Sequence, residues 1–245
     1  MKSLSDHESV RPSESAGIDG EQREGESGVV GNERLTALAG AMLLVLLAGE
    51  LISSASLHTL MPIHVFVGVL LAGPLIVKLS STGWRFLRYY TRAPAYVRRG
   101  PPRLPLRLLA PLLVVMTLLV IGSGIGLVVT GPAQSGLLLP LHNLSVLFWL
   151  SLIAIHVGAY LWRTPRLVAD DWSDRSGKSL EGRWLRLGVN LGALLAGMVA
   201  AILLFPGAAQ WAVWIQTGQT VPAPLIVGLI IAALALLMTR PLRWR

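Results

Sequence analysis

The sequence predicts an all-α integral membrane protein with six transmembrane helices. Apolar residues make up 53% of the 245-residue chain, and charged residues make up only 14%, against roughly 25% in soluble domains. The apolar residues are gathered into six long runs. These runs lack the two-residue alternation of barrel strands, so helices are the structure that would satisfy their backbone groups in lipid.

The six predicted spans follow one another with polar connections between them. The first five have the 20 or so residues that a spanning helix requires, and the last is shorter. Pro74 lies in the middle of the second span, where a proline favours a break in the helix. The predicted spans are residues 35–56, 62–83, 106–129, 141–161, 185–205 and 223–238.

The N-terminal segment, residues 1–33, differs from the rest of the chain in composition. It is acidic, rich in serine and glycine, and poor in large apolar residues. It also lacks the basic start and immediate apolar stretch of a signal peptide. A segment of this kind buries too little apolar surface to offset the entropy lost on folding. We therefore expect residues 1–33 to form a disordered acidic tail in the cytoplasm.

Basic residues occupy every second connection, and this pattern predicts the orientation. Seven arginines and no acid surround the second connection, and further basic residues follow the fourth and sixth spans. The connections after the first, third and fifth spans carry no charge. Basic connections stay in the cytoplasm, so we expect a multi-pass protein of the plasma (inner) membrane with both termini cytoplasmic. The net charge of +8 then reflects topology and not a nucleic-acid partner.

Cysteine and tryptophan give two further indications. The chain has no cysteine, which excludes disulfides, thiolate-held clusters and haem attached through a C-x-x-C-H motif. Most tryptophans and tyrosines flank the basic connections, as interfacial anchors do. Trp211 and Trp214 lie in the last uncharged connection. We expect their segment to lie along the outer membrane surface.

Two histidines, His142 and His156, share the fourth predicted span. They are fourteen residues apart, about 40° short of four helical turns, so both imidazoles project from nearly one face, about 21 Å apart along the axis. The second span repeats this spacing with His64 and Lys78. Ionisable groups inside a span are costly and usually functional. If these two spans face each other, His64 meets His142 at the outer level and Lys78 meets His156 at the inner level.

The outer pair of histidines has the arrangement that two ligands of one haem iron require. We predict His64 and His142 as these ligands, and the small residues of IGSGIGLVV in the third span as the room for a porphyrin edge. His58, at the end of the first span, is either an interfacial polar residue or an alternative to His64 as the outer ligand. His156 either binds a cofactor or donates a hydrogen bond to a neighbouring helix.

Glu50 and Lys78 are the other ionisable residues inside the predicted spans. Glu50 is the only acid there. It either hydrogen-bonds to a ligand imidazole, serves as a proton relay beside a quinol site, or reaches the headgroups. Lys78 either extends to the inner boundary, as long cationic side chains do, or pairs with a haem propionate or a substrate.

The sequence resembles the bacterial membrane-bound four-helix cytochromes b over residues 35–170. This di-haem superfamily includes ferric-reductase-like transmembrane proteins and the membrane anchors of molybdopterin-dependent oxidoreductases. The likeness rests on the paired histidines and on HVFVGVLLAGPLIVKLSSTGWRFLRYYTRAPAYVRRGPP, followed by a Gly-rich span and an L-H-x-x-S…H helix. It implies b-type haem, one or two per chain. His142 and His156 match the paired helix and His64 the opposing ligand, whereas Lys78 stands where a di-haem protein has a second histidine.

The sequence thus predicts a four-helix cytochrome b-like membrane core over residues 34–170, with two additional transmembrane helices and a basic C-terminus over residues 171–245. The predicted function is a b-type cytochrome that passes electrons between the quinol pool and a redox partner. Without a flavin or nucleotide motif, we expect an electron-transfer subunit and not a stand-alone enzyme. The expected partners are membrane lipid, quinone, and a molybdopterin or other oxidoreductase subunit. The alternative is a non-haem membrane scaffold or transporter subunit.

Overall fold

The structure is a computed structural model. It describes residues 12–100, 104–161, 163–172, 182–217 and 224–238, with side chains described from Gly25 onward except at positions 224, 225, 235, 236 and 238. The described residues are helical throughout apart from short turns, which confirms the all-α class. The elements are α1 (Pro12–Ala55), α2 (Leu57–Leu70), α3 (Ala72–Tyr90), α4 (Pro94–Arg99), α5 (Leu104–Thr130), the 3-10 turn η1 (Pro132–Gln134), α6 (Leu138–Tyr160), α7 (Arg163–Trp172), α8 (Arg183–Gln216) and α9 (Pro224–Met238).

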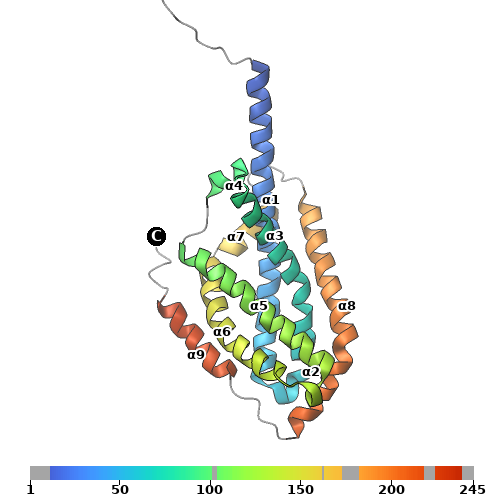
Figure 1. Ribbon diagram of the computed structural model, residues 1–245. Coiled ribbons are helices and arrows are strands. Elements are labelled where there is room, and N and C mark those ends of the chain that lie inside the picture. Colours follow the sequence, from blue (N-terminus) through green and yellow to red (C-terminus); the bar gives the residue numbers. More distant parts are fainter. Residues whose placement is uncertain (1–11, 101–103, 162, 173–181, 218–223, 239–245) are drawn as a thin grey trace, which may run out of the picture.

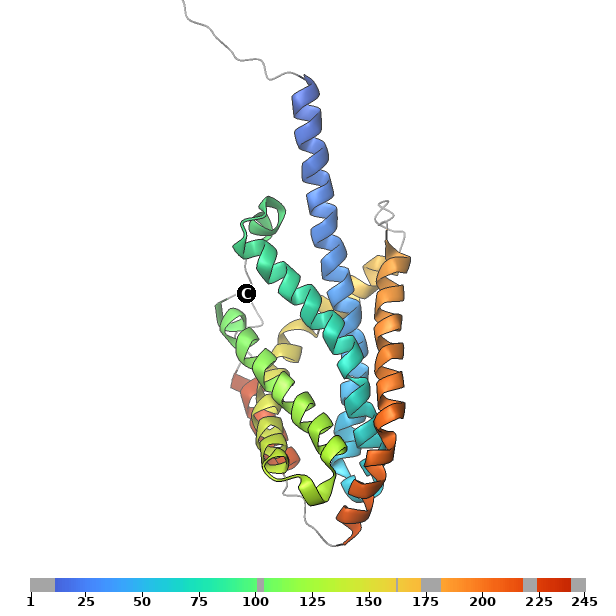
Figure 2. The ribbon, with the colours of Figure 1, turned by 45° about the vertical axis from the view of Figure 1, so that its right-hand side comes forward.

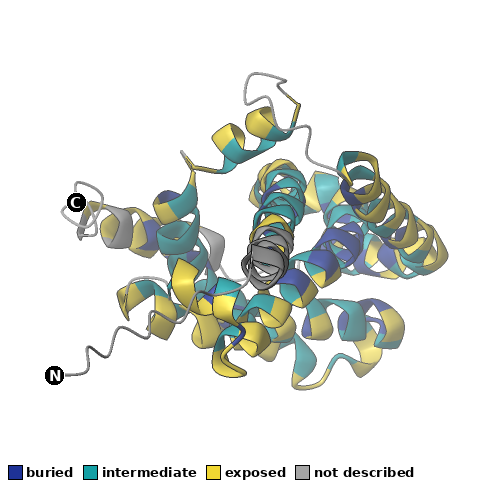
Figure 3. Ribbon diagram, turned by 90° about the horizontal axis from the view of Figure 1, so that it is seen from above, coloured by how far each residue is buried: buried dark blue, intermediate teal, exposed yellow. Residues whose placement is uncertain are grey.

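Five helical stretches of the described chain are long and apolar enough to cross a membrane. They correspond to the first five predicted spans, and α2 and α3 together form the second. The sixth run is helical as well, but α9 has only 15 residues, fewer than the 20 or so of an ordinary span. The exposed residues cover the outward faces of the bundle (Figure 3), and many of them are large and apolar. Such a surface suits lipid as its solvent.

The helices run side by side and give the bundle two different ends (Figures 1 and 2). We call the end with α4, α7 and the start of α8 the charged end, because the basic connections lie there. The opposite end, with the α1–α2 connection and η1, is the uncharged end. The first part of α1 extends beyond the charged end (Figure 1).

The second span is divided at Leu71, as Pro74 favours. Proline has no N–H, and its ring clashes with the carbonyl four residues earlier, which here belongs to Leu70. The chain passes from α2 to α3 through a single turn residue, Leu71, and the Leu71 N–H still donates to the Val67 carbonyl at 3.0 Å. The result is a broken helix that keeps its overall direction.

Helix α8 packs closely along α2 and α3. A Cβ placed on Gly73 would lie 2.0 Å from the Ala193 carbonyl oxygen, and one on Gly197 would lie 2.6 Å from the Leu70 oxygen. Only small residues allow such an approach between helices in lipid. Helix α9 packs against α6 on another side of the bundle. Of the two additional helices predicted after the core of residues 34–170, α8 packs along α2 and α3, and α9 packs against α6.

The predicted disordered tail is helical from Pro12 onward in the structure, and residues 1–11 lie outside the described chain. Val29 is buried against Ala93 and Tyr96 of the α4 region. Glu33 is buried as well, and it forms ion pairs that are described below. These tertiary contacts stabilise the end of the segment that its composition alone would leave unfolded.

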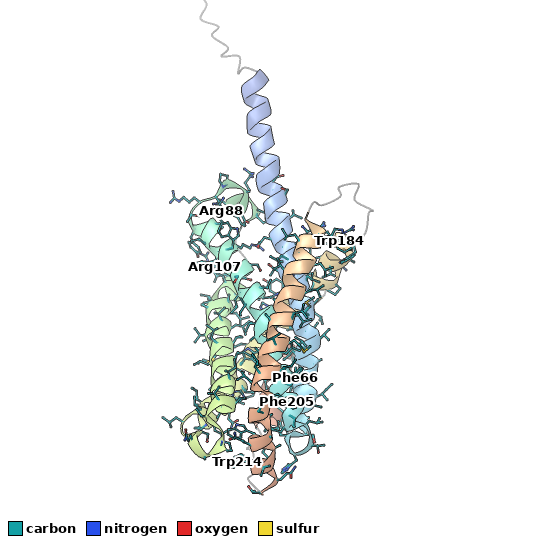
Figure 4. All side chains as sticks on the ribbon, turned by 90° about the vertical axis from the view of Figure 1, so that its right-hand side faces the viewer. Phe66, Arg88, Arg107, Trp184, Phe205 and Trp214 are labelled. Atoms are coloured by element: carbon teal, nitrogen blue, oxygen red, sulfur yellow. The ribbon has the colours of Figure 1, made fainter. Side chains whose placement is uncertain are left out.

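The segment around Trp211 also differs from the expectation. Helix α8 continues past Pro206 to Gln216, so the segment does not lie along a membrane surface. Trp211 is 4% exposed, and its indole N–H donates to the Leu127 carbonyl at 2.9 Å. Proline is tolerated inside membrane helices because neighbouring groups satisfy the freed carbonyl. Figure 4 shows Trp214 at the uncharged end, and Phe66 near Phe205 where α2 meets α8.

Candidate cofactor site

A large cavity of about 910 Å³ lies inside the bundle. Its walls come mainly from α1, α2 and α3 on one side and from α5 and α6 on the other. The cavity exists because, among the described residues, α6 packs against α5 and α9 and not along α1, α2 or α3. All six residues singled out in the sequence line this one cavity: Glu50, His58, His64, Lys78, His142 and His156.

Near the uncharged end, the imidazoles of His64 on α2 and His142 on α6 lie next to each other. Their ring centroids are 6.5 Å apart, and the ring planes are inclined at 76°. The second and fourth predicted spans therefore approach each other at this level, across the cavity. His58, at the exposed start of α2, lines the cavity, but its ring does not contact His142 in the described structure.

The Nδ1 atom of His64 is held by groups on α1. It lies 2.7 Å from Glu50 Oε1 and 3.1 Å from Ser54 Oγ. With Nδ1 engaged by the carboxylate and the hydroxyl, Nε2 is the ring nitrogen left for another partner among the described residues. The second carboxylate oxygen, Glu50 Oε2, is buried and has no hydrogen-bond partner among the described residues.

The Nδ1 atom of His142 is held by α5. It lies 3.1 Å from the Val120 carbonyl oxygen and 3.1 Å from Ser123 Oγ. A carbonyl accepts, so Nδ1 carries the proton and Nε2 remains free. A Cβ on Gly124 would lie 3.2 Å from His142 Cε1. This glycine of the third span therefore makes room for the imidazole.

The inner level of the cavity, toward the charged end, has a different composition. The Lys78 side-chain nitrogen Nζ donates to the Thr36 carbonyl on α1 at 3.3 Å. A Cβ placed on Gly40 would lie only 2.7 Å from this nitrogen, so the glycine makes room for it. The His156 ring lies beside the Tyr160 ring, with centroids 5.0 Å apart and the ring planes inclined at 45°. No described group forms a hydrogen bond with the His156 ring. Lys78 and His156 both line the cavity, so this level has one imidazole where the outer level has two.

Sequence reasoning missed the residues that close the cavity at the uncharged end. Trp211, Trp214 and Ile215 of α8 line it there, and Trp211 and Ile215 belong to an apolar cluster with Met61 and Leu127. The aromatic residues were visible in the sequence, but their burial depends on α8 continuing beyond Pro206. No local signal in the sequence indicates that continuation.

The charged end is held together by a buried carboxylate that sequence reasoning placed in the tail. The Glu33 side chain is 5% exposed. It pairs with Arg99 of α4 at 2.8 Å, with Arg85 of α3 at 3.3 Å and with Arg163 of α7 at 3.5 Å. Charge-assisted hydrogen bonds to several cations are what a buried carboxylate requires. Glu33 thereby joins α1 to three other elements.

A second carboxylate, Asp171 of α7, links α1 to α8. It lies 2.8 Å from Arg34 and 2.5 Å from Arg186. Burial alone would raise the pKa of the Asp171 carboxyl, but hydrogen bonds from Arg186 and then Arg34 outweigh burial and hold the pKa below its ordinary value of 3.8. The Asp171 carboxylate therefore stays ionised at neutral pH, and its ion pairs with Arg34 and Arg186 fix α7 at the charged end.

Among the described residues, no group of three or more histidine, cysteine or acidic side chains is placed to hold a metal ion. A haem needs fewer protein ligands, because the porphyrin occupies the equatorial positions of the iron and the protein supplies axial ligands. The cavity has two imidazoles at one level that meet this smaller requirement.

The described chain is an all-helical bundle whose long apolar helices are compatible with a membrane, and histidines contribute to the lining of its large internal cavity. No family model, curated protein or solved structure matches the chain.

Proposed function

We propose that this chain is a membrane-embedded b-type cytochrome that passes electrons between the quinol pool and a redox partner. One haem b would lie in the cavity near the uncharged end, with His64 and His142 as its iron ligands. The observation that carries this proposal is the pair of adjacent imidazoles, each held through Nδ1 by another helix.

The separation of the two rings supports ligation of a common iron. Two imidazoles on opposite sides of one iron have centroids roughly 6 to 6.5 Å apart, given metal–nitrogen bonds of about 2 Å and about 1.1 Å from nitrogen to ring centre. The centroids of His64 and His142 are 6.5 Å apart. Ligation of one iron would require both Nε2 atoms to point toward it.

The hydrogen bonds at Nδ1 support the same role. A metal-bound histidine almost always donates its other N–H to a carboxylate or a backbone carbonyl, which fixes the tautomer and the ring orientation. Glu50 supplies the carboxylate for His64, and Val120 supplies the carbonyl for His142. Nδ1 of each imidazole is thus engaged by another helix, which leaves Nε2 as the nitrogen that would ligate iron.

The cavity also suits a large, mostly apolar group. Its volume of about 910 Å³ lies within the range of about 300–1,000 Å³ for ligand and cofactor sites. Its walls are largely leucine, isoleucine and valine, which would keep water away from the iron. Haem bound here would supply a one-electron couple whose potential depends on the ligands and their burial.

The membrane arrangement belongs to the same proposal. All six predicted spans would cross the plasma membrane, with the four that carry the cavity as the haem-binding bundle. The charged end would face the cytoplasm, because arginines are retained there. The sequence carries no flavin or nucleotide motif, so an oxidoreductase subunit, of the molybdopterin type or another, would exchange electrons with the haem.

The test is an optical spectrum of the purified chain with its haem-to-protein ratio. We expect a sharp reduced-minus-oxidised haem band and a ratio near one. The His142→Ala variant should lose most of the haem, since a single remaining imidazole holds iron weakly. The matched control is His58→Ala, which should keep the wild-type ratio. A folded, colourless protein from haem-replete cells would overturn the proposal.

A further inference from the structure

We propose that the inner half of the cavity binds a quinone headgroup, with Lys78 and His156 donating hydrogen bonds to its carbonyl oxygens. This inference rests on the proposed function, because the quinone would be the molecule that exchanges electrons with the haem at the other end of the same cavity. It assigns the site and the residues that recognise the headgroup.

The first argument is that the inner half has hydrogen-bond donors without matching acceptors. The Lys78 ammonium has three N–H groups, and its one hydrogen bond within the described structure is the 3.3 Å bond to the Thr36 carbonyl. The ring of His156 has no described hydrogen-bond partner. The one acid that lines the cavity among the described residues is Glu50, which is engaged with His64 at the outer level.

Unsatisfied hydrogen-bond donors inside an apolar cavity cost free energy unless a ligand accepts from them. An ammonium and an imidazole inside a membrane span normally pair with each other or with backbone groups, or mark a ligand pathway. In the described structure these two side chains face the same cavity and do not hydrogen-bond to each other. A ligand that brings oxygen acceptors between them would satisfy both.

The shape and polarity of the inner half favour a flat apolar ligand over a small anion. The cavity lining is mostly apolar, with Leu75, Leu113 and Ile153 among its residues, and the hydroxyl groups of Thr82 and Tyr160 also line it. Such walls would solvate a hydrated anion poorly. A quinone headgroup presents an apolar ring to these walls and carbonyl oxygens at opposite edges.

The cavity also has an opening of the right kind for an isoprenoid tail. Leu44 of α1 and Leu161 at the end of α6 both line the cavity, and they are 37% and 36% exposed. Helices α1 and α6 do not pack along each other in the described chain, which would leave a gap between them. A lipid-soluble molecule could enter from the bilayer through this gap with its tail left in lipid.

A second haem does not fit the inner half as these residues are placed. Bis-imidazole ligation there would need a second histidine opposite His156, and Lys78 stands in its place. Its ammonium is tied to α1 at Thr36, in the space that Gly40 leaves.

The experiment measures quinone binding to the full chain, purified into lipid nanodiscs. Decylubiquinone and menadione are titrated while the fluorescence of tryptophan is recorded, because Trp149 lines the cavity between the two levels. Lys78→Met and His156→Leu should each raise the Kd tenfold or more. Lys78→Gln keeps an N–H donor and should stay within about threefold of wild type. Ser151→Ala, on α6 but outside the cavity lining, is the matched control and should be unchanged.

Two results would overturn the inference. The first is an unchanged Kd in both Lys78→Met and His156→Leu while the spectra show folded protein. The second is a haem-to-protein ratio of two that falls to one in His156→Leu, which would place a haem in the inner half. A chain without any haem whose quinone binding still depends on Lys78 would refute the proposed cytochrome and uphold the inner site.

Discussion

The two imidazoles at the outer level are held by acceptors of different strength. Glu50 places a carboxylate oxygen 2.7 Å from His64 Nδ1, whereas His142 faces a neutral carbonyl and a hydroxyl at 3.1 Å. A charged acceptor forms the shorter and stronger bond, and it raises the basicity of the ligand more. If His64 ligates the proposed haem, Glu50 would position His64 and strengthen its bond to iron.

Replacing Glu50 tests this role. Glu50→Gln keeps the shape of the side chain but removes the charge, and we expect it to lower haem affinity about 10- to 100-fold, as is typical for partners of ligand histidines. The measurement is the transfer of haem from the purified chain to an excess of apomyoglobin. Ser123→Ala is the control, because the Val120 carbonyl still holds His142, and it should change affinity little. Equal haem loss in both variants would contradict the assignment.

At the residue scale, the sequence pointed to ionisable residues that line the cavity, but it did not show their contacts. Ionisable groups inside apolar runs stand out, because lipid makes them costly, so Glu50, His64 and Lys78 were recognisable without a structure. Their partners depend on how each helix is rotated about its axis. The hydrogen bond from Lys78 to Thr36 on α1 could not be predicted from spacing.

At the scale of the elements, the contact between α3 and α8 determines how α2 and α3 are held behind the cavity. Gly73 lies one residue before Pro74, so the closest approach of α8 coincides with the break in the second span. Gly197 on α8 faces the Leu70 carbonyl there. This carbonyl lacks its usual helical donor, because Pro74, four residues later, has no N–H. The small residues therefore allow a broken helix to be supported by its neighbour.

Two glycines of α3 allow a matched test of this contact. A Cβ at Gly73 would lie 2.0 Å from the Ala193 oxygen, whereas one at Gly83 would meet nothing within 4 Å. Gly73→Ala must push α3 and α8 apart, and we expect a loss of stability of about 1–3 kcal/mol, as for other overpacked interiors. Gly83→Ala should be neutral or slightly stabilising, because alanine favours helix. Thermal unfolding of both variants in the same detergent measures the difference, and similar Tm values would contradict the packing.

The element that the sequence could not place is α8. Its apolar run was recognisable, but Pro206 and the following polar residues suggested an end at residue 205. The helix continues because Trp211 and Ile215 are buried against α2 and α5, which is a tertiary effect. For the same reason Pro74 predicted the break between α2 and α3 but not which helix would cover it.

At the scale of the whole molecule, charge is separated along the length of the bundle. Arg88 and Trp184 lie toward one end in Figure 4, and Trp214 lies at the other. Glu33 and Asp171 neutralise part of the arginine cluster at the charged end and tie α1, α3, α4, α7 and α8 together. The composition of residues 1–33 predicted a disordered tail. Composition carries no information on tertiary contacts, so it could not show that Glu33 would pair with three arginines from distant segments.

This separation of charge predicts an orientation, and the chain is well suited to test it because it contains no cysteine. Single cysteines are introduced at Gln134 in η1, at the uncharged end, and at Thr91 beside α4, at the charged end. In intact cells a membrane-impermeant maleimide should label Gln134→Cys, whereas Thr91→Cys should react only after lysis, because arginine-rich connections are retained in the cytoplasm.

The same labelling decides whether the sixth run crosses the membrane. A cysteine appended after Arg245 should behave like Thr91→Cys if α9 spans, because an even number of spans returns the C-terminus to the side of the N-terminus. Fifteen residues at 1.5 Å each give a helix of only about 22 Å, less than the 30 Å of an average hydrocarbon core. Crossing would therefore require local thinning of the bilayer or helical residues beyond Met238. Labelling of the appended cysteine in intact cells, together with Gln134→Cys, would instead show five spans and a C-terminus outside the cytoplasm.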